Sequence, residues 1–120
     1  MSDTRLRVER ALVVLIALHS IGIGLGAVFF APWGLRFGGF ENVSPIFFPR
    51  QVGIFHVLAG IAYLIEYFRY RGVAILLTAK CLAVLFLTAM MLADDLPWVV
   101  PFSAAGDGAM ALAVLAVRRR

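Results

Sequence analysis

Five ionisable side chains interrupt the apolar stretches of this chain, and they are the residues best suited to chemistry. They are His19, His56, Glu66, Lys80 and Asp107. An ionisable group surrounded by hydrocarbon is costly to keep charged, so each of them needs a partner or a role in binding or proton transfer. A lysine and an aspartate that meet there lower each other's desolvation cost. We therefore expect the last two to form an ion pair.

Two interpretations of this predicted pair stay open. In the first, the pair only fixes the register of two helices. In the second, the pair and His19 together bind a polar headgroup or pass a proton. His19 equally fits a hydrogen bond to a backbone carbonyl or to a hydroxyl such as that of Ser20. Arg50 fits a lipid phosphate, or it orients an anionic or carbonyl-bearing ligand. Glu66 is three residues from Arg69, which predicts a pair along one helix.

The two histidines do not predict a haem site. Counted from the predicted helix ends at 1.5 Å per residue, His19 and His56 differ in depth by about 9 Å, whereas axial ligands need nearly equal heights. His56 therefore stays a candidate for ligand binding or proton relay. The single Cys81 excludes an intrachain disulfide and a cysteine-based metal cluster. We assign no catalytic residue and no metal ligand, and the cofactor stays unknown.

The amino-acid composition indicates what kind of protein holds these residues. The 120 residues are 62% hydrophobic and only 15% charged, and the mean hydropathy is +0.95. A globular domain is about a quarter charged, so this composition is typical of a membrane protein. The net charge of +4 comes from residues at the edges of apolar runs. That placement fits lipid headgroups and argues against nucleic acid as a partner.

Four apolar runs are each about 20 residues long, enough to cross about 30 Å of hydrocarbon as a helix. Helices are favoured because unpaired backbone groups cannot face lipid. The predicted fold class is all-α, an integral membrane four-helix antiparallel bundle forming one transmembrane domain over residues 1–120. The predicted spans cover about 11–31, 50–70, 73–93 and 98–117.

The arginines predict the orientation of these spans. The amino tail, the turn between spans two and three, and the carboxyl tail together hold eight arginines, against two in the remaining connections. Basic segments stay on the cytoplasmic side, so both termini should be cytoplasmic. We expect a multi-pass protein of a bacterial inner membrane. The eight are Arg5, Arg7, Arg10, Arg69, Arg71, Arg118, Arg119 and Arg120, and the two are Arg36 and Arg50.

The connections and glycines carry three further expectations. Segment 32–49 is rich in aromatic residues, which favours an anchor in the outer interface or a lid over a pocket between helices. The short connection 70–72 predicts that spans two and three are tightly packed neighbours. Gly22 and Gly26 form a small-xxx-small pair. We expect that pair to pack inside the bundle, with a homodimer interface as the alternative.

Short patterns in three spans resemble those of the DoxX-like group of small bacterial membrane proteins. This resemblance implies a four-helix bundle and a poorly characterised role, linked in some relatives to redox or quinone-linked membrane complexes. It supplies no agreed catalytic set. Small multidrug transporters and fluoride channels are less similar to this chain. The resemblance is carried by Pro49-Arg50 with Gly53, the stretch HVLAGIAY at 56–63, Lys80, and the run AAGDG at 104–108.

These features predict a non-enzymatic membrane protein that binds a hydrophobic ligand, lipid or quinone-like, or a membrane partner. Lys80 and Asp107 are its central polar element. One alternative is a proton-coupled transporter of a small molecule that uses Asp107 and His19 as titrating groups. Another is an accessory subunit of a respiratory or redox complex.

Overall fold

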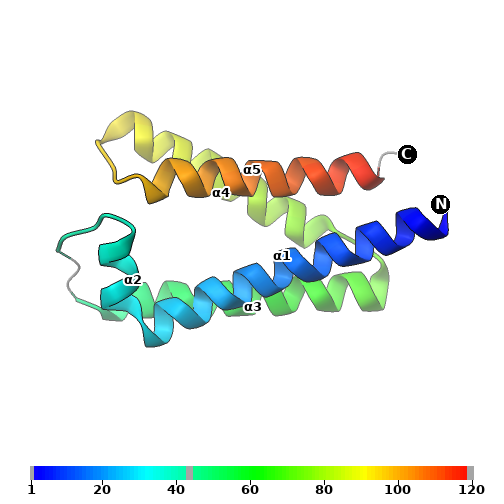
Figure 1. The fold of residues 1–120 in the computed structure, drawn as a ribbon, viewed down its shortest axis with the longest axis horizontal. Helices are drawn as coiled ribbons and strands as arrows, with labels where there is room; N and C mark the ends of the chain where they lie inside the picture. The colour runs from blue at the N-terminus through cyan, green and yellow to red at the C-terminus, as the bar shows by residue number, and fades with distance from the viewer. Residues whose placement is uncertain (1, 43–44, 119–120) are drawn as a thin grey trace.

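The computed structural model describes residues 2–42 and 45–118, and within them it contains helices and no strand (Figure 1). The predicted all-α class is confirmed for this part of the chain. A short helix accompanies four long ones. The helices are α1 (Asp3–Phe29), α2 (Ala31–Phe37), α3 (Phe47–Tyr70), α4 (Ala74–Ala93) and α5 (Val99–Arg118).

Helices α1, α3, α4 and α5 are long and apolar enough to cross a membrane. Their large apolar side chains point outward as well as inward. Leu15 is 64% exposed, Leu85 is 68% exposed and Leu92 is 85% exposed. A continuous apolar exterior on hydrogen-bonded helices is suited to lipid and not to water. The chain is thus a multi-pass membrane protein in a bilayer environment.

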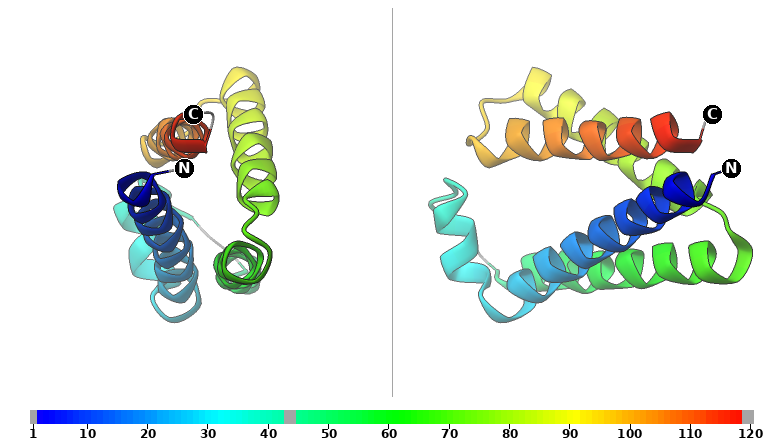
Figure 2. Two further views of the ribbon diagram at one scale, coloured as in Figure 1. Left: turned by 90° about the vertical axis from the view of Figure 1, so that its right-hand side faces the viewer. Right: turned by 45° about the vertical axis from the view of Figure 1, so that its right-hand side comes forward.

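The long helices pack as two pairs. Helix α1 lies across α3 along much of its length, and α4 lies against α5. Figure 1 shows the two chain ends at the same end of the molecule. Figure 2 shows α4 diverging from α3 after the turn that joins them. The prediction that spans two and three are tightly packed neighbours is therefore wrong beyond that turn, because each helix finds its main partner elsewhere.

Glycines allow α1 and α3 to cross in backbone contact. A Cβ atom added to Gly53 would lie 2.6 Å from the carbonyl oxygen of Gly24, and one added to Gly60 would lie 2.7 Å from that of Ala17. Around Gly22 and Gly26 the same test finds open space. The prediction that those two pack inside the bundle is wrong, because the crossing uses the helix face of Gly24.

Two boundaries differ from the predicted spans. Helix α1 begins at Asp3, so the predicted amino tail is helical, and the Ser2 hydroxyl accepts a hydrogen bond from the Arg5 amide at 3.2 Å. Charged residues are kept out of hydrocarbon but not out of a helix, and the hydropathy pattern therefore misses these turns. The predicted loop 32–49 contains α2, with Pro32 in its first turn, where no amide hydrogen is needed.

The turn between α3 and α4 gives Glu66 a different partner from the predicted one. Arg71 adopts a left-handed conformation with φ of 58°, and the Gly72 amide donates to the Glu66 carbonyl at 3.2 Å. The Glu66 carboxylate accepts a hydrogen bond from the Ile75 amide at 2.9 Å. Glu66 therefore caps the start of α4 and does not pair with Arg69, because an unsatisfied helix amide lies closer to it.

The two helix pairs are joined at both ends of the molecule. At the end that carries the termini, a core of buried side chains includes Val13, Tyr67, Leu76 and Val114. At the opposite end α2 meets the start of α5, where the Phe37 ring lies 5.9 Å from that of Trp98. The middle of the molecule is less tightly filled.

Candidate functional site

Lys80 of α4 and Asp107 of α5 form an ion pair in this middle region. The Lys80 Nζ atom lies 2.9 Å from the Asp107 Oδ1 atom, and their side chains are 8% and 17% exposed. Helices α4 and α5 are adjacent and packed together, so the lysine spans the remaining distance without leaving the bundle. The two residues singled out from the sequence are thus brought into contact.

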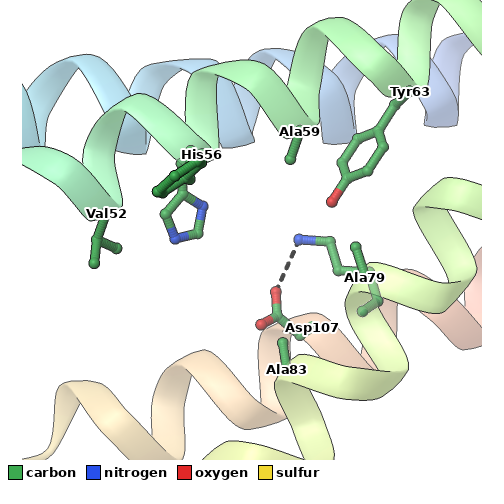
Figure 3. Close-up of a pocket in the computed structure, with 9 residues that line it drawn as sticks. Val52, His56, Ala59, Tyr63, Ala79, Ala83 and Asp107 are labelled. Atoms are coloured by element: carbon green, nitrogen blue, oxygen red, sulfur yellow. Dashed lines mark hydrogen bonds and ion pairs between the residues drawn. The ribbon is translucent and has the colours of Figure 1, made fainter.

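The ion pair forms part of the wall of a cavity of about 230 Å³ between α3 and the α4–α5 pair (Figure 3). Helix α3 supplies one wall and the other two helices supply the opposite one. The lining residues are Val52, Phe55, His56, Ala59 and Tyr63 from α3, Ala79, Lys80 and Ala83 from α4, and Asp107 from α5.

The sequence of α3 explains this wall. Val52, His56, Ala59 and Tyr63 follow one another at intervals of four, three and four residues, which places them on one face of a helix. Alanines at 59, 79 and 83 leave room that larger side chains would fill. The cavity therefore results from small residues around a charged pair, with Ala59 on the opposite wall and Ala79 and Ala83 on the same wall.

The polar groups of the cavity converge on the ion pair. Figure 3 shows the Tyr63 hydroxyl and the His56 ring directed from α3 toward the other wall. A lysine ammonium has three N–H donors, and one of them is used by Asp107. Among the described residues, the second carboxylate oxygen of Asp107 accepts no hydrogen bond. The site can therefore both donate hydrogen bonds to a ligand and accept them.

His19 and Arg50 lie outside this lining. His19 is exposed on α1, and Arg50 is exposed in the first turn of α3. Of the five residues proposed from the sequence, the cavity gathers three and leaves these two apart. The described side chains of His, Cys, Asp and Glu form no group of three that could hold a metal ion.

The depth difference predicted for the two histidines is wrong. The Ser20 hydroxyl donates to the His56 carbonyl at 2.7 Å, so the turns that carry His19 and His56 face each other across the α1–α3 crossing. The estimate of depth began at Ala11, whereas α1 begins at Asp3. Glu9, two residues before Ala11, is hydrogen-bonded to Tyr67 near the end of α3, so depths counted from Ala11 are too small relative to those of α3.

A second buried polar cluster, which the sequence analysis missed, lies near the chain termini. The Tyr67 hydroxyl donates to Glu9 at 2.9 Å, and Arg118 donates to Glu9 at 3.4 Å and to the Arg71 carbonyl at 3.1 Å. Glu9 is only 2% exposed. It could have been found from its helix face, because it precedes Val13 by four residues in the buried series of α1.

Comparison with protein-family models, with curated proteins and with solved structures found no match to this chain. Its site is therefore interpreted from its own residues and geometry.

Proposed function

We propose that this chain is a small membrane protein that binds a hydrophobic ligand, lipid or quinone-like, in the cavity beside Lys80 and Asp107. The observation that carries the proposal is the combination of an ion pair with an unfilled space. Polar side chains converge there while neighbouring positions are kept small. Convergent polar groups in an otherwise apolar concavity are the usual form of a small-molecule site.

A purely structural role for the pair explains less. A buried ion pair adds little stability compared with well-packed apolar residues of similar volume. A pair that served only to hold α4 against α5 would need no open space beside it. Here Tyr63 and His56 approach the pair from a third helix, so the arrangement fits a ligand between the walls.

Filling the cavity tests this function. Ala83→Leu places a larger side chain in the lining, whereas Ala89→Leu makes the same change at an exposed position of the same helix. We expect extraction and mass spectrometry of purified protein to find a bound apolar molecule in the wild type and in Ala89→Leu. The Ala83→Leu variant should lose most of it. Equal amounts in all three proteins would contradict the proposal.

The titratable groups of the cavity favour a second candidate function, proton-coupled transport of a small molecule. Asp107 and His56 lie in one lining, so His56 replaces His19 as the predicted second titrating group. In proteoliposomes with an imposed pH gradient, Asp107→Asn should abolish substrate uptake driven by that gradient. Uptake that survives this change removes the transport candidate.

The same proposal includes the setting of the protein. We propose an antiparallel bundle in a bacterial inner membrane with both termini in the cytoplasm. The end that carries the termini and the α3–α4 turn holds six described arginines, against two in the rest of the described chain.

Membership of the DoxX-like group is part of the proposal. It is supported by the resembling residues Gly53 and Gly60 at the helix crossing, and Lys80 and Asp107 in the ion pair.

A further inference from the structure

We infer that the cavity selects ligands whose polar head is uncharged and carries an oxygen that accepts hydrogen bonds, such as a ketone, ester or alcohol with a long apolar remainder. This inference rests on the proposed ligand-binding function and specifies its ligand class. It follows from the charge balance of the lining, the unused hydrogen-bonding groups and the size of the cavity.

With the His56 imidazole neutral, the lining is electrically balanced before any ligand enters. Lys80 and Asp107 contribute one charge of each sign at 2.9 Å, and the other lining residues are alanines, Val52, Phe55, Tyr63 and His56. A ligand with a full charge would leave one charge uncompensated at membrane depth, where its desolvation is expensive. An uncharged head avoids that penalty, so the pair discriminates against anions and cations alike.

The unused polar groups match an uncharged oxygen-bearing head. Two N–H groups of Lys80 and the hydroxyl of Tyr63 can donate to a carbonyl or hydroxyl oxygen. The second carboxylate oxygen of Asp107, which accepts no hydrogen bond from the described residues, can accept one from a hydroxyl. A hydrocarbon without a polar head would leave these groups facing apolar atoms, which costs free energy for each unsatisfied group. The site therefore disfavours plain alkanes as well.

The volume limits which part of the ligand is enclosed. At about 230 Å³ the cavity is smaller than the roughly 300–1,000 Å³ that encloses a drug-sized ligand, so it has room for a head and not for a whole lipid. Val52 and Phe55 line the cavity and are themselves 54% and 58% exposed, so the space reaches the lipid-facing surface at α3. The head thus lies beside the ion pair, and the apolar remainder extends past these two side chains into the bilayer.

Three photoreactive probes with the same C18 chain test the charge selectivity. One ends in an alcohol, which is uncharged, one in a sulfonate, which is negative, and one in a trimethylammonium group, which is positive. None of these charges changes at any pH used. With full-length protein in lipid nanodiscs, we expect saturable labelling near Val52 and Phe55 by the alcohol. We expect at least tenfold less by either charged probe, with labelling displaced by unlabelled long-chain ketone.

Variants of the Lys80–Asp107 pair should change which of the three probes labels the protein most strongly. Asp107→Asn leaves a positive lining and should make the sulfonate the best probe, whereas Lys80→Met leaves a negative lining and should favour the trimethylammonium probe. Asp95→Asn removes an exposed carboxylate outside the cavity and should keep the alcohol first. Size-exclusion profiles confirm which variants are folded.

The wild-type protein alone decides between two kinds of failure. No saturable labelling by any of the three probes would overturn the proposed ligand-binding function. Saturable labelling in which a charged probe equals or exceeds the alcohol would overturn the charge selectivity and leave ligand binding in place. Both results are readable even if the variants do not fold.

Discussion

At the scale of single residues, the ion pair is the feature that most constrains this membrane protein. Lys80 and Asp107 are both largely shielded, and each is the charged partner that the other requires. Removing one partner of a buried pair leaves an uncompensated charge, which is far more damaging than removing both. The pair can therefore be probed by comparing single with double replacements.

We predict that Asp107→Asn lowers the free energy of unfolding by about 3 kcal/mol, because Lys80 loses its counter-charge. The double variant Lys80→Met with Asp107→Leu should lose less than the single one. Unfolding by SDS in mixed micelles, followed by circular dichroism, measures both. Asp95→Asn, at an exposed position, should stay within about 0.5 kcal/mol of the wild type. A double variant less stable than the single would refute this explanation.

The hydroxyl of Tyr67 supports the second cluster and can be removed without changing the size of the core. Tyr67→Phe should lower the free energy of unfolding by about 2 kcal/mol, because the buried Glu9 carboxylate, a charged acceptor, loses the hydrogen bond that the Tyr67 hydroxyl donates. Tyr70→Phe is the matched control at a residue that is 69% exposed. Equal stability of the two variants in the same micelle assay would show that the hydrogen bond contributes nothing.

The pairing of Lys80 with Asp107 could be inferred from the sequence, whereas the partners of Glu66 and Glu9 could not. Two lone opposite charges in adjacent apolar helices leave few arrangements open. Glu66 had a choice between an arginine on its own helix and the free amides of the next helix, and the sharp turn at Arg71 decides for the amide of Ile75. The helix face of Glu9 indicates burial, but its partners Tyr67 and Arg118 lie on other helices and depend on how those helices pack.

At the scale of elements, the crossing of α1 and α3 depends on which glycines face the partner helix. Gly53 and Gly24 meet backbone to backbone, whereas Gly22 and Gly26 have open space around the position of a side chain. Spacing of small residues indicates that a helix has a surface for close contact, but it does not say which face is used. For this reason the sequence predicted the existence of a glycine-mediated contact and chose the wrong pair in α1.

This difference between faces predicts opposite effects of the same substitution. Gly53→Ala should destabilise by about 2 kcal/mol, because the added methyl group meets the Gly24 carbonyl and separates the helices. Gly26→Ala should be neutral or stabilising by about 0.5 kcal/mol, since alanine is the better helix former and has space. Thermal unfolding of the detergent-solubilised variants measures both effects. Similar losses of stability in Gly53→Ala and Gly26→Ala would mean that α1 and α3 do not meet through the Gly24 and Gly53 faces.

At the scale of the whole molecule, the two helix pairs are fastened at their ends and separated by the cavity in the middle. The Glu9 cluster ties α1, α3 and α5 near the termini, and the aromatic contact between Phe37 and Trp98 ties α2 to α5 at the other end. Hydropathy predicted the long helices because length and apolar character set them. The pairing of α1 with α3 and of α4 with α5 depends on side-chain contacts that hydropathy does not describe.

The same view of the molecule predicts its orientation in the membrane. Both chain ends and the arginine-bearing turn lie at one end (Figure 1), so that end should face the cytoplasm. With Cys81 replaced by serine, a single cysteine at Ser2 should resist a membrane-impermeant maleimide in intact cells and react after lysis. A single cysteine at Asn42 or at Asp95, both exposed and in connections distant from the termini, should react in intact cells. Labelling of Ser2→Cys in intact cells would show that the protein has the opposite orientation, with its termini outside the cytoplasm. Labelling of Asn42→Cys but not Asp95→Cys would mean that α4 and α5 do not both cross the bilayer.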